Sequence, residues 1–355
     1  MKAAVVVGYN DIQYMDIANP EVNAGEVKVA VSYCGICGSD IPRVLKGTCH
    51  SFPQVLGHEF SGVVTEVADG VASIQPGDHV VGVPLVPCHQ CEDCKKGHYS
   101  LCKHYSFVGS RQQGAMAEYV VLPVNNVYKI DKRIPMHLAA LFEPSTVALH
   151  GIQINNFHPT PDDHVVVIGA GTIALFAIQW CKILGAKHIT VVIRNKSREG
   201  IVRKYGAHDV VSSLDNDYVE TAMTITKGKG FTYVFDAAGT NDTIKTSFRL
   251  AANKAKVCLI GTPTKPVAFS VKEWELINRK EMLLTASWMS YSAPWPGEEW
   301  RMTAECMADG RLILDEDMIH TYYSLNRIKD SFKELEVNSS AVKGRVMLDV
   351  EGLNH

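Results

Sequence analysis

The spacing of hydrophobic residues changes near residue 150, which divides the chain into two kinds of sequence. Up to that point, apolar residues form short β-like runs separated by glycine, as at 26–31, 62–67 and 79–83. Alternation of apolar and polar positions, with a Pro-Gly-Asp turn at 76–78, predicts an antiparallel, barrel-like β domain. The apolar run within residues 1–9 is expected to be its first strand.

Beyond residue 150, continuous apolar runs alternate with helical patterns. The run 164–168 is typical of a strand buried on both faces of a parallel sheet. Further strands are expected at 188–193, 209–212, 233–236, 256–260 and 283–287. Six strands alternating with helices predict an α/β fold with a doubly wound, Rossmann-type parallel sheet. We therefore expect a dinucleotide-binding domain at 151–287 and another domain at 1–150, completed by 288–355, to which the run 343–350 returns as a strand.

Composition narrows the functional classes. A chain of 355 residues exceeds what one core usually holds, and 46% hydrophobic with 21% charged residues is ordinary for a globular protein. A net charge of -3 gives no reason to propose a nucleic-acid or membrane partner. Apolar runs fall short of the roughly 18 residues that a membrane span needs, and the N-terminal run is too short for a signal peptide. A cytoplasmic protein is expected.

A glycine-rich turn follows the strand at 164–168. Its sequence, Gly169-Ala170-Gly171-Thr172-Ile173-Ala174, has the Gly-x-Gly-x-x-Gly/Ala pattern between a strand and a helix. The glycines let the backbone approach a pyrophosphate, which then lies at the helix N-terminus. Candidate coenzyme-binding residues are Gly169, Gly171, Thr172 and Ile173; a tight turn without a ligand is the alternative.

The end of the second predicted strand indicates which coenzyme binds. Folds that prefer NAD place an acidic residue there, to hold the ribose 2′-hydroxyl. Here three cations, Arg194, Lys196 and Arg198, precede the first carboxylate, Glu199. They can hold a 2′-phosphate by charge-assisted hydrogen bonds, so NADP is predicted. If the turn is only a solvated basic surface, NAD is the alternative.

Four of the ten cysteines lie close together in the sequence, at Cys88, Cys91, Cys94 and Cys102. Such clusters in a reducing compartment are more often metal sites than disulfides. Two-residue spacings let thiolates face one centre, and four thiolates satisfy tetrahedral zinc without an open position. A structural zinc site is predicted.

A second set of metal-ligand types is spread over the first domain. Cys37, the pair His58-Glu59 and Glu143 offer the donors that zinc accepts, and three ligands with an open position make a catalytic site. Taken alone, the His-Glu pair can also be a buried histidine beside a surface glutamate, with no metal bound. The accompanying Cys37 and Glu143 favour a catalytic zinc, and which glutamate binds it stays open.

These motifs together resemble the medium-chain, zinc-dependent alcohol and polyol dehydrogenases over almost the whole chain. The resemblance rests on Gly-Ile-Cys-Gly-Ser-Asp at 35–40, Gly-His-Glu at 57–59, the four cysteines, Glu143-Pro144 and Gly169-Ala170-Gly171. It implies a GroES-like β-barrel catalytic domain, in which Cys37, His58 and Glu59 hold the catalytic zinc. Glu143 then matches a glutamate that binds the metal or its water, and Ser39 matches a hydroxyl that relays the substrate proton. Hydride passes between a secondary alcohol and a nicotinamide coenzyme.

Shorter runs resemble the branch of this family that acts on phosphorylated hexitols, at 38–43, 107–111 and 287–300. They imply oxidation of a hexitol phosphate such as galactitol 1-phosphate to tagatose 6-phosphate. Arg43 or Arg111 is then the candidate phosphate anchor, although either can be a surface arginine. Trp288, with Tyr291 and Trp295, can line the polyol site or pack in the core. A dehydrogenase of unphosphorylated, sorbitol-type polyols and a non-enzymatic binding relative stay open as alternatives.

The resemblance also implies a homodimer or homotetramer. The last predicted strand of the coenzyme sheet, 283–287, should be an edge with unpaired backbone groups that a second copy covers.

Overall fold

The structure, a computed structural model, describes residues 1–337 and 341–352. The chain forms two compact units. The first contains Met1–Glu143, Tyr291–Asp309 and the described part of Leu314–His355, and the second contains Pro144–Ser290 with Gly310–Ile313. The first boundary lies inside helix α4 (Phe142–Ile154), whereas the sequence predicted a division near residue 150.

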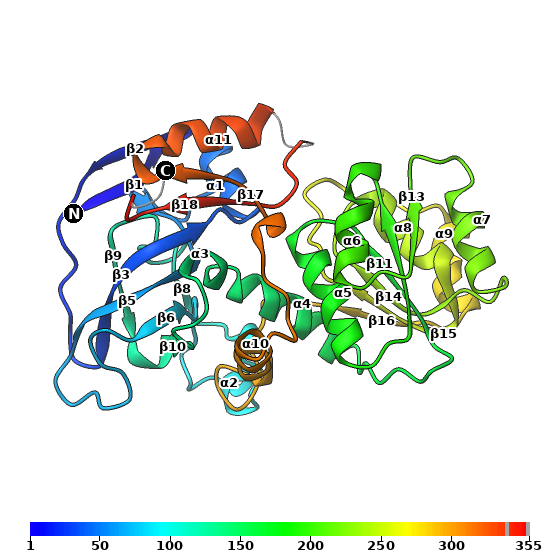
Figure 1. The fold of residues 1–355 in the computed structure, drawn as a ribbon, viewed down its shortest axis with the longest axis horizontal. Helices are drawn as coiled ribbons and strands as arrows, with labels where there is room; N and C mark the ends of the chain where they lie inside the picture. The colour runs from blue at the N-terminus through cyan, green and yellow to red at the C-terminus, as the bar shows by residue number, and fades with distance from the viewer. Residues whose placement is uncertain (338–340, 353–355) are drawn as a thin grey trace. The chain divides into compact units, whose positions relative to one another are not determined.

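The first unit is built on a large sheet in which the described strands run in the order β10-β6-β5-β3-β18-β17, with β9 also paired to β3 (Figure 1). Its strands are β3 (Glu26–Gly35), β5 (Glu59–Val67), β6 (His79–Gly82), β9 (Tyr119–Pro123), β10 (Val127–Lys129), β17 (Ile319–Ser324) and β18 (Arg345–Asp349). Two smaller sheets comprise β1 (Lys2–Gly8), β2 (Asp11–Asp16) and β4 (Gln54–Val55), and β7 (Leu85–Val86) with β8 (Ser106–Phe107). The helices of this unit are α1 (Asp40–Leu45), α2 (Glu92–Lys95), α3 (Met136–Ala139), α10 (Glu298–Ala308) and α11 (Ile328–Val337).

The C-terminal strand returns to the first unit, as predicted. Strand β18 pairs antiparallel with β3, with Leu348 opposite Cys34. The described strand pairs within residues 1–150 are antiparallel, as predicted, whereas β17 and β18 from the C-terminal segment are parallel. Parallel neighbours need a crossover connection, and helix α11 lies between these two strands in the sequence.

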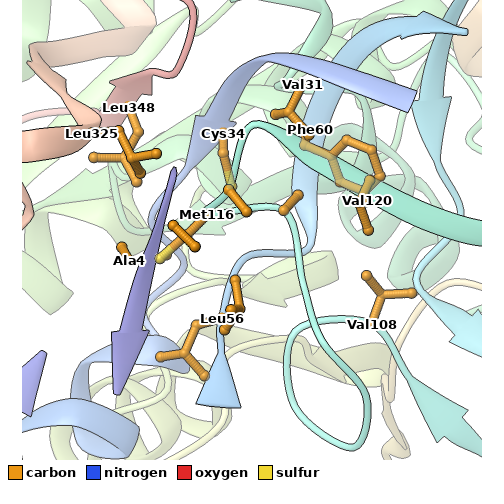
Figure 2. Close-up of a cluster of buried hydrophobic side chains, with 14 of the residues drawn as sticks. Ala4, Val31, Cys34, Leu56, Phe60, Val108, Met116, Val120, Leu325 and Leu348 are labelled. Atoms are coloured by element: carbon orange, nitrogen blue, oxygen red, sulfur yellow. The ribbon is translucent and has the colours of Figure 1, made fainter. Parts of the chain in front are cut away.

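Residues from both ends of the chain share the core of this unit (Figure 2). Alternate residues of β3, Val27, Val29 and Val31, are buried, as the alternation of apolar positions predicts. Leu325 and Leu348 from the C-terminal segment belong to the same cluster. Burying each such side chain stabilises the fold by about 1.5–3 kcal/mol, so the C-terminal segment is part of this unit's core.

The second unit contains a parallel sheet whose described strands run in the order β13-β12-β11-β14-β15-β16. They are β11 (His164–Ile168), β12 (His188–Ile193), β13 (Asp209–Ser212), β14 (Phe231–Asp236), β15 (Ala251–Leu259) and β16 (Leu283–Ala286). This is the doubly wound order, which confirms the predicted fold class. Helices α5 (Thr172–Ile183) and α6 (Glu199–Tyr205) pack together, as do α7 (Tyr218–Ile225), α8 (Asn241–Leu250) and α9 (Val271–Arg279) (Figure 1).

Among the described strands of this sheet, β16 has one neighbour, β15, and two of its apolar side chains are exposed. Leu283 is 50% exposed and Leu284 is 38% exposed. None of the described helices has the length and apolar character needed to cross a membrane.

Candidate functional site

Strand pairing brings together three of the predicted zinc ligands. Strands β3 and β5 are antiparallel, with Gly35 opposite Glu59. Cys37 lies just beyond the end of β3 and His58 just before the start of β5, so their side chains meet at the same end of the strand pair. The candidate ligand atoms of Cys37, His58 and Glu59 lie within 4.8 Å of one another.

Gly57 is required for this arrangement. Its φ is +95°, and an added Cβ would lie 2.7 Å from Cys34 Sγ and 2.9 Å from the Met116 backbone nitrogen. A side chain at this position would therefore clash and strain the backbone. The glycine lets the chain turn directly into His58.

The surroundings of this cluster fit a bound zinc ion. Burial raises the pKa of the Cys37 thiol, and the nearby Glu59 carboxylate raises it further. A thiol that coordinates a metal is deprotonated, so a cation here would reverse that tendency. The Oε2 atom of Glu59 is buried without a hydrogen-bond partner and can serve as a ligand.

Asp40, which the sequence reading missed, orients two members of the cluster. Its Oδ2 accepts a hydrogen bond of 3.1 Å from the Cys37 backbone, and its Oδ1 lies 3.7 Å from His58 Nδ1. A carboxylate facing one ring nitrogen of a histidine leaves the other nitrogen for the metal. Its position three residues after Cys37 was the available signal.

Arg345, also missed, supplies a buried positive charge. Its Nε lies 2.7 Å from Glu59 Oε2 and its Nη1 donates to the Ile36 carbonyl at 3.1 Å. The Nε–H does not align with the carboxylate as a hydrogen bond, so this contact is a charge pair. No local sequence signal links residues so far apart, because strand β18 brings Arg345 to the site.

Glu143 lies beside this cluster rather than within it. It is buried, and the group of mutually close ligand atoms comprises Cys37, His58 and Glu59. Burial raises the pKa of the Glu143 carboxyl to about 7, with opposing effects from His58 and Glu59. The geometry therefore favours Glu59 as the ligand, with Glu143 as a neighbouring carboxyl group.

Ser39 and Arg43 lie on the solvent side of Asp40. Arg43 Nη1 donates to Ser39 Oγ at 2.9 Å and lies 3.0 Å from Asp40 Oδ1. Ser39 itself is exposed, so its hydroxyl can pass a proton toward solvent. Arg43 was predicted as a phosphate anchor, but its guanidinium already contacts Ser39 and Asp40.

Arg111 is placed differently. It is exposed, its guanidinium lies over the Tyr105 ring at 4.4 Å, and its backbone N–H donates to the Phe107 carbonyl. The Phe107 ring contacts the His58 ring edge-on, at 5.4 Å between centroids. Gly109 in the same loop packs on Gly57, because an added Cβ would lie 2.4 Å from its carbonyl oxygen.

The aromatic residues predicted near the substrate have separate locations. Trp288 belongs to the second unit and is 51% exposed. Tyr291 is buried, and Trp295 stacks on it at 5.4 Å in the first unit. Tyr291 therefore packs in the core, which was the alternative to lining the polyol site.

The four cysteines of the predicted structural site come together. Cys88, Cys91, Cys94 and Cys102 have ligand atoms within 4.8 Å of one another. Backbone N–H groups of Cys88 and Cys91 point at Cys102 Sγ and Cys88 Sγ, at 3.3 and 3.4 Å. Backbone N–H groups lower the pKa of the Cys91 thiol to about 6. All ten cysteines of the chain are free thiols, and this group fits a tetrahedral zinc ion.

The glycine-rich turn has the geometry of a coenzyme site. Gly169 has φ +121° and Gly171 caps the N-terminus of α5, whose first residues are Thr172 and Ile173. The cavity beside this turn has a volume of about 670 Å³, and Arg194 is among its lining residues.

The three cations predicted to bind a 2′-phosphate have different roles. Arg194 is exposed at that cavity. Lys196 pairs with Asp215 at 2.7 Å, and Arg198 is buried and donates to the Ala170 carbonyl at 3.0 Å. Arg198 therefore supports the glycine-rich turn, and Arg194 is the cation best placed to meet a phosphate.

Two family models match the chain. The alcohol dehydrogenase GroES-like domain matches residues 23–132, and the zinc-binding dehydrogenase model matches residues 172–307. These regions contain Cys37, His58, Glu59 and the four-cysteine group in the first, and most of the coenzyme sheet in the second.

Curated relatives match over nearly the full length. The chain is 34% identical to galactitol 1-phosphate 5-dehydrogenase of Escherichia coli K12, over 93% of this chain and 94% of that protein. It is 29% identical to D-arabitol-phosphate dehydrogenase of Enterococcus avium, over 94% of each. It is 26% identical to sorbitol dehydrogenase of Arabidopsis thaliana, over 96% of this chain and 93% of that protein.

Solved structures agree with these matches. The crystal structure of galactitol-1-phosphate dehydrogenase from Escherichia coli superposes with a TM-score of 0.92 and 32% identity, covering 99% of this chain and 100% of that one. A zinc-binding dehydrogenase of Sinorhizobium meliloti 1021 bound to NADP has a TM-score of 0.88 and 26% identity, covering 98% and 99%. The chain belongs to the medium-chain, zinc-dependent alcohol dehydrogenase family, and it is an NAD(P)-dependent oxidoreductase with a catalytic Cys/His/Glu site and a structural four-cysteine site.

Proposed function

We propose that this enzyme oxidises a secondary alcohol of a hexitol phosphate, converting galactitol 1-phosphate to tagatose 6-phosphate. Relatives named for a phosphorylated hexitol and a phosphorylated pentitol support this substrate class. The relative named for sorbitol supports the second candidate, an unphosphorylated polyol. We also propose that the enzyme is located in the cytoplasm.

The site residues divide the work of the reaction. A zinc ion polarises the alcohol oxygen and a nicotinamide coenzyme accepts the hydride, which is the chemistry these groups supply when bound. Cys37, His58 and Glu59 hold the metal, and Asp40 keeps the His58 ring oriented. Ser39 takes the proton lost by the alcohol and passes it to solvent, aided by the positive Arg43 that donates to its oxygen.

The observation that carries the phosphate assignment is the contrast between two arginines. Arg43 already contacts Ser39 and Asp40, so a phosphate there would disturb the support of His58. Arg111 offers an exposed guanidinium that lies over the Tyr105 ring and donates to the Tyr105 hydroxyl at 3.4 Å, in a loop whose Phe107 contacts His58. A guanidinium binds phosphate through two parallel hydrogen bonds, and one already held over an aromatic ring loses less side-chain freedom on binding.

The test compares galactitol 1-phosphate with galactitol in the wild type and in Arg111→Ala. A charge-assisted hydrogen bond contributes about 1.5–3 kcal/mol, so kcat/KM for the phosphate should fall about 10- to 100-fold, with little change for galactitol. Arg133→Ala is the matched control, since Arg133 is an exposed arginine of the same unit that pairs with Asp131. If free galactitol is the better substrate of the wild type, the sorbitol-type function replaces this one.

The coenzyme assignment rests on Arg194 at the cavity beside the glycine-rich turn. We propose NADP as the preferred coenzyme, with the Arg194 guanidinium on the 2′-phosphate. NAD is the alternative if Arg194 contacts only solvent.

We further propose that two copies pair along strand β16. Its outer edge offers unpaired backbone groups, and Leu283, Leu284 and Trp274 expose apolar surface around it. Light scattering at micromolar concentration should report a dimer or tetramer; a monomer would contradict this arrangement.

A further inference from the structure

Four aromatic rings form a continuous column in the first unit. Trp295 stacks on Tyr291 with ring centroids 5.4 Å apart, and Tyr291 lies against Trp300 at 6.0 Å, both with interplanar angles of 17°. Trp300 then stacks on Phe142 at 5.4 Å and 29°. Tyr291, Trp300 and Phe142 are buried, so these rings have little room to move independently.

One end of the column lies under the four-cysteine lobe, residues 88–102. The Leu85 backbone N–H donates to the Tyr291 hydroxyl at 3.3 Å, and Ser100 Oγ donates to the Tyr291 carbonyl at 3.4 Å. The Trp295 ring contacts the ring of His89, which directly follows Cys88, at 5.6 Å. The lobe is therefore in direct contact with the segment that carries Tyr291 and Trp295.

The same segment approaches the lobe at a second point. An added Cβ on Gly97 would lie 2.6 Å from the Ala293 side chain, so only glycine fits there. Tyr99 also packs edge-on against Trp295, at 5.1 Å. The lobe and residues 291–295 thus form one packed body.

The other end of the column lies at the catalytic cluster. Phe142 is the first residue of helix α4, and Glu143 follows it directly. Glu143 is buried, and the charges of His58 and Glu59 both act on its carboxyl group. Phe142 and Glu143 are consecutive residues of one helical turn, so the backbone that holds the Phe142 ring also holds the Glu143 carboxylate.

We propose that the column Trp295–Tyr291–Trp300–Phe142 is a positioning device that couples metal binding in the four-cysteine lobe to the placement of Glu143 at the catalytic zinc site. The four-cysteine site then has a catalytic consequence besides stabilising the fold. The inference rests on the proposed dehydrogenase function and on the role that the family resemblance implies for Glu143, binding the metal or its water. The column residues act through that carboxylate without touching substrate.

The decisive test is a double-mutant cycle of Trp300→Leu with Glu143→Gln. If the column acts through Glu143, Trp300→Leu alone should lower kcat about tenfold. The same substitution in a protein that already carries Glu143→Gln should lower kcat by no more than roughly twofold. Equal losses in both backgrounds would overturn the coupling. No effect of Glu143→Gln alone would overturn the role of Glu143, a different failure from that of the substrate assignment.

A spectroscopic readout removes the dependence on substrate. Co²⁺ loaded at the catalytic site, with zinc in the lobe, has visible absorption that reports the geometry of its ligands. Trp300→Leu should change this spectrum and Trp300→Phe should restore it. Phe332→Leu is the matched control, because Phe332 is a buried ring of the same unit outside the column, and its variant should keep the wild-type spectrum.

Trp295→Leu gives a second variant should Trp300→Leu not fold, since Trp295 is only partly buried and lies at the far end of the column. It should change the Co²⁺ spectrum in the same direction. A folded Trp295→Leu protein with the wild-type spectrum would contradict the coupling.

Discussion

The Nε atom of Arg345 lies 2.7 Å from Oε2 of Glu59, although the two residues come from opposite ends of the chain. The Glu59 side chain is 2% exposed and that of Arg345 is 11% exposed, and Glu59 Oε2 keeps no hydrogen bond. The C-terminal strand β18 thus delivers a fixed positive charge to the carboxylate that we assign to the catalytic zinc.

Arg345→Met tests this charge pair. It leaves a buried carboxylate without its partner, so the zinc-free protein should lose about 3–5 kcal/mol in its free energy of unfolding. Zinc binding compensates the carboxylate, so the zinc-loaded protein should lose less. Denaturant unfolding with and without zinc measures both.

Arg327→Met is the control for this variant. Arg327 pairs with Asp330 at the surface, and exposed pairs contribute about 0.2–1 kcal/mol. Equal destabilisation by the two variants would show that the buried pair has no special weight.

Asp40→Asn should weaken the catalytic zinc. Asp40 faces His58 Nδ1 and accepts from the Cys37 backbone, so the change disturbs the orientation of two ligands. Loss of such a supporting carboxylate typically costs about 10- to 100-fold in metal affinity. Competition with a chromophoric chelator gives the affinity, and an unchanged value would remove Asp40 from the site.

Cys94→Ser should mainly lower stability, whereas His58→Ala should mainly remove activity. Cys94→Ser opens the four-thiolate site and should lower the unfolding midpoint, since metal binding there contributes to folding. His58→Ala should keep the fold and lose activity. Each variant should retain one zinc per chain, which metal analysis can verify; a stable Cys94→Ser protein with two zinc ions would refute the assignment.

Arg194→Asp should reverse or abolish a preference for NADP. The guanidinium at the coenzyme cavity is replaced by a carboxylate, which repels a 2′-phosphate and can accept a bond from a 2′-hydroxyl. Efficiency with NADP should fall about tenfold or more, as one charge-assisted contact is lost. Lys196→Ala should change little, because Lys196 pairs with Asp215.

The sequence predicted the elements whose pattern is local. Strands β11 and β12 have the expected bounds, and the four cysteines come together as their spacing indicates. Contacts between distant segments were not predictable in this way. Arg345 reaches Glu59 only through strand pairing, and the parallel β17–β18 pair depends on a crossover that alternation does not reveal.

The side-chain contacts in the structure also distinguish arginines that the sequence left equivalent. Arg43 and Arg111 are both candidate phosphate anchors in the sequence, since Arg43 follows Cys37 closely and Arg111 lies in a second run that resembles the hexitol-phosphate branch. The structure separates them, because Arg43 bonds to Ser39 and Asp40 whereas Arg111 lies exposed on Tyr105. The sequence of the basic turn at 194–198 likewise does not indicate which cation faces the coenzyme. The structure excludes Arg198, because its guanidinium donates to the Ala170 carbonyl.

The measurement that tests the central claim most directly is a zinc titration of metal-free protein, with dehydrogenase activity followed at each step. The clusters at Cys37-His58-Glu59 and at the four cysteines predict two zinc ions per chain. Activity should be absent without zinc and should rise with occupancy of the catalytic site, and His58→Ala should bind one ion fewer and stay inactive. A stable, zinc-free protein with full activity would contradict the account.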